Sequence, residues 1–103
     1  MIVRIWSART CGDPAAYERE FHTHVLGSLG GLAGFHGAYL LRRATGTAIE
    51  FVTLTLFDSL DDVHGFAGAD VDVANVSPAA RAALDDVDER VRHYTVVSAP
   101  VPR

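Results

Sequence analysis

The 103-residue sequence has one cysteine and no lysine. A lone cysteine, Cys11, excludes an intrachain disulfide and a thiolate metal cluster, and it fits a reducing cytoplasm. The nine basic residues are all arginines, scattered along a chain of net charge -4, which argues against a nucleic-acid partner. No apolar run approaches the roughly 20 residues of a membrane span, and the opening MIVRIW is too short for a signal-peptide core. We therefore expect a cytoplasmic protein without a membrane partner.

Sequence motifs for common catalytic and cofactor sites are missing as well. There is no Gly-x-Ser-x-Gly turn, and Cys11 has no evident basic partner along the sequence. There is no glycine-rich phosphate loop, since Gly30 and Gly31 follow a predicted helix instead of opening one. The five histidines have none of the spacings typical of a metal site. We therefore predict no metal, flavin, haem or nucleotide cofactor.

The composition is that of a single folded domain. With 49% hydrophobic and 21% charged residues, the chain is too apolar to be disordered, and its length suits one core. No repeat, long linker or low-complexity tract divides it. We predict one domain over residues 1–99 and a flexible tail from Pro100 to Arg103.

The first half of the chain predicts a strand, a helix and a hairpin. Ile2–Ala8 is rich in β-branched and aromatic residues, which is typical of a strand. A helix is expected from Asp13 to about Leu29, because an N-cap aspartate is followed by a proline at the first helical position. Two further strands are predicted at Ala38–Leu41 and Ile49–Phe57, with a turn at Thr45–Thr47 between them.

The second half predicts two short helices and a last strand. Ser59 and Asp62 resemble a capping box that opens one helix, and Ser77 with the following proline opens another in AARAALDDV. Val91–Val97 closes the pattern as a strand. The order β-α-β-β-α-β predicts an α+β fold of the ferredoxin-like type, with an antiparallel sheet.

The third predicted strand is apolar on both faces. Its alternating side chains form two sets, Ile49, Phe51 and Phe57 on one face and Val52, Leu54 and Leu56 on the other. The helices of such a domain cover only one face, and an apolar face open to water is an association hazard. We therefore predict a homodimer in which two sheets pack together about a two-fold axis.

Four segments carry a family resemblance: MIVRIW, GAYLLRR, EFVTLTLFDSLDDVHGFAG and VRHYTVV. Over nearly the whole chain they resemble the antibiotic biosynthesis monooxygenase superfamily. The resemblance implies a dimeric α/β barrel, with a pocket in each subunit between the sheet and its own helices. Some members oxidise aromatic polyketides with molecular oxygen and neither metal nor flavin, and others degrade haem.

The haem-degrading pattern is incomplete in this sequence. Those members use an asparagine on the first strand together with a tryptophan and a histidine in the second helical region. Here Ser7 stands at the asparagine position, Phe66 stands at the tryptophan position, and no histidine follows in GADVDVANV. This departure from the pattern argues against haem degradation.

Two histidines are candidate catalytic residues. Helical spacing places His24 on the apolar side of the first helix, between Phe21 and Ser28, where it is expected to point toward the sheet. It is either a general base for a phenolic substrate or a structural histidine bonded to a neighbour. His93 lies on the last strand, on the face of Val91, and is either a second base or a core or interface histidine.

The candidate substrate-binding residues are aromatic, with one arginine. They are Trp6 and Tyr39 on strands, Tyr17, Phe21 and Phe66 on helices, and Arg4 on the first strand. The aromatic side chains would form a wall against a planar ligand, and the guanidinium would hold an anionic oxygen. The alternatives are ordinary core packing for the aromatics and a surface or interface ion pair for the arginine.

These observations favour a cofactor-independent monooxygenase for an aromatic, polyketide-like small molecule. The residues of the protein would supply deprotonation, orientation and donors for the anion, and the substrate would supply the electrons. Two alternatives stay open: a non-oxidative cyclase or isomerase on the same scaffold, and a binding dimer without catalysis.

Overall fold

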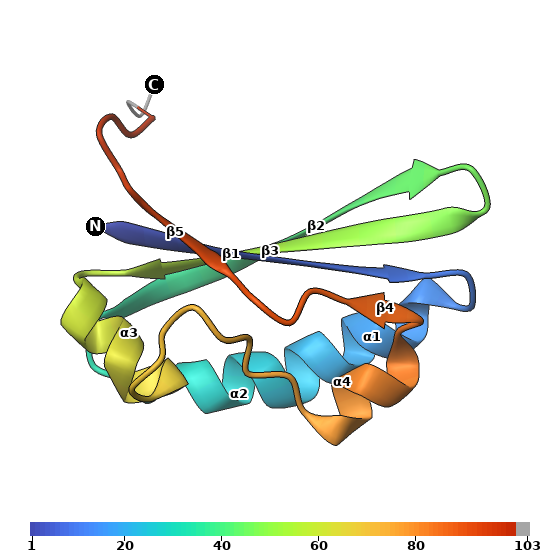
Figure 1. Ribbon diagram of the computed structural model, residues 1–103, viewed down its shortest axis with the longest axis horizontal. Helices are drawn as coiled ribbons and strands as arrows, with labels where there is room; N and C mark the ends of the chain where they lie inside the picture. Colours follow the sequence, from blue (N-terminus) through green and yellow to red (C-terminus); the bar gives the residue numbers. More distant parts are fainter. Residues whose placement is uncertain (101–103) are drawn as a thin grey trace.

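A computed structural model of the protein describes residues 1–100, so residues 101–103 of the predicted tail lie outside the described part. One antiparallel sheet and a layer of helices make up the fold (Figure 1). The strands are β1 (Ile2–Thr10), β2 (Phe35–Thr45), β3 (Ala48–Phe57), β4 (Asp86–Val87) and β5 (Arg92–Thr95). Their order is β2-β3-β1-β4, and β5 also pairs with β1. This arrangement confirms the α+β class and is compatible with a ferredoxin-like fold.

The helices all lie on one side of the sheet (Figure 1). The first is continuous over α1 (Pro14–Glu20), the π-helical turn η1 (Phe21–Val25) and α2 (Leu26–Leu29), and the others are α3 (Leu60–Ala67) and α4 (Pro78–Ala83). The predicted caps are confirmed: the side chain of Asp13 accepts from Ala15 N at 2.9 Å, and that of Ser59 from Asp62 N at 3.3 Å. Among residues 1–100, none of these helices has the length and apolarity needed to cross a membrane.

Several predicted elements have different boundaries in the structure: β1 runs on to Thr10, and β5 is shorter than the predicted strand Val91–Val97. The second strand is longer than predicted, since β2 pairs with β3 from the bulge at Phe35 and Gly37 out to the hairpin end. The helix predicted in AARAALDDV ends at Ala83, because Leu84 is extended and packs in the core. The backbone after it forms β4, which pairs with Ala8 and Arg9 of β1. A local sequence pattern reveals neither the full length of β2 nor the presence of β4, since both depend on pairing with another strand.

The core lies between the sheet and the helices in two clusters. Tyr17 and Phe21 of the first helix pack on Phe51, and Leu29 packs with Phe57 and Val63. The side chains of Phe51 and Phe57 are fully buried on the helix-facing side of β3. Between them, the same face of β3 carries threonines instead of apolar residues, and this is the stretch over which a cavity forms.

The other face of the sheet has no helix over it (Figure 1). By strand alternation and register it carries Val3, Ile5, Tyr39, Leu41, Val52, Leu54, Leu56 and Tyr94. Tyr39 is 59% exposed and Tyr94 is 52% exposed. The described chain therefore presents an open apolar sheet face, defined by these eight residues.

Candidate functional site

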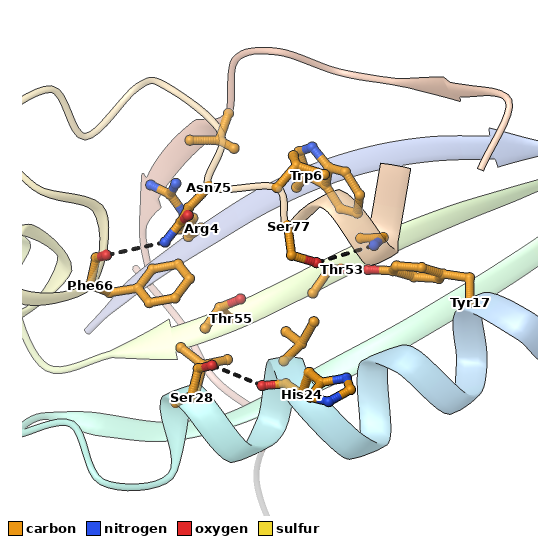
Figure 2. Close-up of a pocket in the computed structure, with 15 residues that line it drawn as sticks. Arg4, Trp6, Tyr17, His24, Ser28, Thr53, Thr55, Phe66, Asn75 and Ser77 are labelled. Atoms are coloured by element: carbon orange, nitrogen blue, oxygen red, sulfur yellow. Dashed lines mark hydrogen bonds between the residues drawn. The ribbon is translucent and has the colours of Figure 1, made fainter. Parts of the chain in front are cut away.

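A cavity of about 160 Å³ lies between the helix-facing side of the sheet and the helices. Figure 2 shows Arg4 and Phe66 toward one end, Tyr17 and Thr53 toward the other, and Thr55 between them. The lining is completed by Trp6, His24, Val25, Ser28, Leu29, Asn75, Val76, Ser77, Ala80 and Val91. The structure thus brings together residues of β1, β3 and the first helix with the loop between α3 and α4.

Arg4 is a buried cation at one end of this cavity. The residue is 4% exposed, and its Nη1 donates to Val71 O at 2.5 Å while its Nη2 donates to Val73 O at 3.0 Å. Its guanidinium carbon lies 5.6 Å from the centre of the Phe66 ring, within the range of a cation–π contact. Burial lowers the pKa of Arg4, and the charge of Asp72 counteracts part of that decrease. A buried guanidinium facing an aromatic cavity is a site for an anionic oxygen.

His93 contacts Arg4 and does not line the cavity. Arg4 Nη1 donates to His93 Nε2 at 3.0 Å, and His93 Nδ1 lies 3.4 Å from Asp72 Oδ1. Acceptance at Nε2 implies a neutral ring with its proton on Nδ1, toward Asp72. Burial and the Arg4 cation lower the pKa of His93, and the hydrogen bond to Asp72 opposes them. His93 therefore positions the guanidinium. Its predicted role as a base would need a ring nitrogen free to contact a ligand, but Nε2 accepts from Arg4 and Nδ1 faces Asp72.

The aromatic lining comes from three of the predicted residues, Trp6, Tyr17 and Phe66. Trp6 Nε1 donates to Asp88 O at 2.7 Å, which fixes the indole with its ring edge-tilted to Tyr17, centroids 6.0 Å apart. Tyr17 is buried, and desolvation raises the pKa of its hydroxyl to about 12, so it stays a neutral donor and acceptor at physiological pH. These rings give the cavity flat apolar surface for a planar ligand.

Thr53 and Thr55 are site residues that the sequence analysis missed. Each is 6% exposed and lies on β3 between the buried Phe51 and Phe57. Thr53 Oγ1 is buried without a hydrogen-bond partner in the described chain. The Tyr17 hydroxyl is near enough to Thr53 for its pKa to be affected, yet the two groups do not meet hydrogen-bond geometry. Polar side chains on the buried face of a central strand are the signal that would have revealed them.

His24 lies at the rim of the cavity, and its predicted burial is wrong. Its side chain is 68% exposed, and Nδ1 is 2.6 Å from Oε1 of Glu20, a carboxylate that is itself 8% exposed. The π-helical turn explains the difference: its bond from Leu26 N to Phe21 O encloses one more residue than an α-helical turn, so α-helical counting misplaces His24. The carboxylate orients the imidazole and leaves Nε2 free, which is the arrangement of a general base.

Tyr39 and Phe21 lie outside the cavity, contrary to prediction. Tyr39 pairs with Leu54, so its side chain belongs to the open apolar sheet face, opposite that of Trp6. Phe21 is buried in the core beside Tyr17 and is not exposed to the cavity. Strand alternation decides the first case, and helix packing decides the second.

The remaining polar groups form local contacts away from the cavity. His36 pairs with Asp58, the ring of His22 contacts Glu18 O, and His64 Nδ1 contacts Gly68 O. Within residues 1–100, no three His, Cys, Asp or Glu side chains gather closely enough to hold a metal ion. Cys11 is exposed.

The arrangement has three chemical capabilities. The cavity can enclose an aromatic ring, Arg4 can hold an oxygen that carries negative charge, and the Glu20–His24 pair at the rim can accept a proton. No protein-family model matches the chain, and a search of curated proteins finds no match either.

Proposed function

We propose that the protein is a cofactor-independent oxygenase for a small phenolic molecule. The observation that carries the proposal is the buried Arg4 guanidinium at the end of an aromatic cavity. Removing the proton of a phenol makes the ring rich in electrons, and a fixed cation stabilises the resulting anion. The Glu20–His24 pair supports the same reaction, because it places a proton acceptor at the cavity rim.

The chemistry needs molecular oxygen as the co-substrate and no other oxidant. His24 takes the proton that leaves the substrate, and Arg4 holds the oxygen on which the negative charge develops. The anion passes one electron to oxygen, and recombination of the two radicals forms a carbon–oxygen bond and a peroxide, which His24 protonates. The ring carbon then loses its hydrogen as a proton while the oxygen–oxygen bond breaks. The phenol becomes a quinone, one oxygen atom stays in it, and the other leaves as water.

The shape of the cavity favours small substrates. An engineered apolar cavity of ~150 Å³ in another protein holds one benzene molecule, so about 160 Å³ admits a single ring. A larger, polyketide-like substrate would extend past His24 and Ser28, which are exposed at the rim. The enclosed part of the site also limits contact between the radical pair and water.

Oxygen uptake with resorcinol as the phenol tests this proposal. We expect the protein to consume oxygen and form a hydroxyquinone, with Arg4→Met and His24→Gln each lowering the rate per folded protein by roughly 10²-fold or more. The matched control is His22→Gln, two residues away, whose side chain lies outside the cavity and whose rate should not change.

Two results count against an oxygenase. Absence of protein-dependent oxygen uptake refutes it, and equal conversion of resorcinol under nitrogen indicates a non-oxidative cyclase or isomerase instead. Equal rates in His22→Gln and His24→Gln would remove His24 from the mechanism, since only His24 lines the cavity.

We further propose that a second copy of the chain covers the open apolar sheet face, which would give the dimeric barrel. Apolar side chains occupy the middle of this face, while the paired charges of Arg43 and Glu50, 2.6 Å apart, lie toward the hairpin end. An apolar centre with a charged margin is typical of a protein–protein interface. The exposed thiol of Cys11 supports a location in the reducing cytoplasm.

Sedimentation at micromolar concentration tests the dimer. We expect a dimer for the native chain and a monomer for Leu54→Glu, which places a charge at the centre of the open face. Ala82→Glu, on the exposed side of α4, is the matched control and should remain a dimer. A native monomer, or a Leu54→Glu dimer, would contradict the proposed interface.

A further inference from the structure

The loop between α3 and α4, residues 68–77, forms one wall of the cavity and is held against the sheet by Arg4. Its last residues line the cavity, among them Asn75 (Figure 2). The buried guanidinium of Arg4 donates to two carbonyls of this loop, Val71 O at 2.5 Å and Val73 O at 3.0 Å. These bonds join β1 to backbone 67 and 69 residues further along the chain, so the position of Arg4 affects the cavity wall.

His93 is the third partner of Arg4 and also contacts the loop. Arg4 Nη1 donates to His93 Nε2 at 3.0 Å, and His93 Nδ1 lies 3.4 Å from Oδ1 of Asp72, a loop residue. The side chain of His93 is 10% exposed, and the charged groups that face it within residues 1–100 are Arg4 from β1 and Asp72 from the loop. The bond from Arg4 needs a lone pair on Nε2, so it forms only with the neutral ring.

Protonation of His93 breaks this contact. A proton on Nε2 points one N–H at another and places a second positive charge beside Arg4. Asp72 favours the imidazolium, but its side chain is 56% exposed, so solvent screens much of the attraction. Burial and the Arg4 cation lower the pKa of His93, so the contact is complete above the ordinary value of 6.5 and is lost as the pH falls through the folded pKa.

We propose that Arg4, His93 and Asp72 form a pH-sensitive latch on the cavity, in which protonation of His93 releases the α3–α4 loop. The backbones of Arg4 and His93 are fixed opposite each other in the β1–β5 ladder, whereas the loop is attached by an isolated bridge from Val73 to Arg90. The loop is therefore the part that moves, and the cavity wall is in place at neutral pH and released in mild acid. This inference goes beyond the proposed reaction and holds for any ligand that the cavity takes.

Amide hydrogen exchange followed by NMR tests the latch without a substrate. Two amides that join the loop to the chain after α4 serve as reporters. Ala74 N donates to Glu89 O at 2.8 Å, and Val91 N donates to the loop carbonyl Asp72 O at 2.8 Å. In native protein we expect their protection factors to fall roughly tenfold or more between about pH 7.5 and about pH 5, the scale of one hydrogen bond to a charged group, while amides of β3 stay protected.

Three substitutions distinguish His93 from other groups. His93→Gln keeps an acceptor for Arg4 and a donor for Asp72 but does not titrate, so the reporter protection should not change with pH. Asp72→Asn removes the charge that favours the imidazolium and should move the loss of protection to lower pH. His64→Gln is the matched control, because His64 Nδ1 donates to Gly68 O at 2.9 Å at the other end of the loop and keeps that proton in both charge states. It should behave as native protein does.

Several results would overturn the latch. If the reporter amides stay protected in acid, or lose protection only together with those of β3, the loop is not released. If His93→Gln loses protection as native protein does, or if His64→Gln abolishes the loss, His93 is not the group that titrates. An unchanged transition in Asp72→Asn would remove Asp72 from the latch. None of these results depends on oxygen uptake, so failure of the latch and failure of the oxygenase are distinguishable.

Discussion

The unpartnered hydroxyl of Thr53 leads to a prediction about stability in the absence of ligand. Thr53→Val replaces the hydroxyl with a methyl group of similar size and keeps a β-branched side chain suited to a central strand. The residue is 6% exposed, and its Oγ1 has no hydrogen-bond partner in the described chain. The substitution should therefore make the protein more stable.

The size of this gain follows from the cost of burying an unpartnered polar group, about 1–3 kcal/mol. The nearby Tyr17 hydroxyl interacts with Thr53 enough to affect its own pKa, so we expect the lower end, about 1 kcal/mol. For a domain of this size, that corresponds to a rise in Tm of roughly 4–8 °C. Scanning calorimetry of ligand-free protein near neutral pH measures it.

Thr55→Val is the matched control for this prediction. Thr55 has the same exposure and lies on the same face of β3. Unlike Thr53 Oγ1, its hydroxyl oxygen does not belong to the buried atoms that lack a hydrogen-bond partner. We expect no comparable gain there. A Tm for Thr53→Val equal to or below that of native protein would refute the reasoning, because it would show that Thr53 Oγ1 is already satisfied in the empty cavity.

Two further predictions concern His93 and the glycines. Because burial and the Arg4 cation lower the pKa of His93, the unfolded chain binds its proton more readily, and stability should be lost as the pH falls below the ordinary value of about 6.5 and through the folded pKa. His93→Gln should flatten the acid side of a urea-unfolding series, and parallel native and variant curves would contradict this. Gly34→Ala should destabilise more than Gly46→Ala in the same assay, since both have positive φ but only at Gly34 would a Cβ clash with the Asp62 carboxylate. Equal losses would show that Asp62 moves aside freely.

The sequence predicted the sheet and the caps well because these depend on local signals. Alternation in Ile49–Phe57 and the N-cap positions Asp13 and Ser59 appear in the structure as expected. Strand ends were less predictable, because β4 forms only through pairing with β1. Local propensity carries no information about such a partner.

The site was predicted in part. Arg4, Trp6, Tyr17 and Phe66 line the cavity because strand and helix periodicity placed them correctly. His24 lines the cavity too, but its predicted burial was wrong, because it lies in a π-helical turn that no composition or spacing announces.

Two other features of the site depend on the tertiary structure. Tyr39 was grouped with Trp6 although the β2–β3 register puts it on the opposite face. The contact from His93 to Arg4 joins residues far apart in sequence, so the sequence pattern alone could not assign its positioning role.

Isotope labelling of the product tests the central claim most directly. Native protein is incubated with resorcinol under heavy-isotope oxygen, and the hydroxyquinone is examined by mass spectrometry. The proposed reaction predicts one heavy oxygen atom in each product molecule, with Arg4→Met forming little product. Product without heavy oxygen, or product that forms equally well under nitrogen, would contradict an oxygenase acting at the Arg4 cavity.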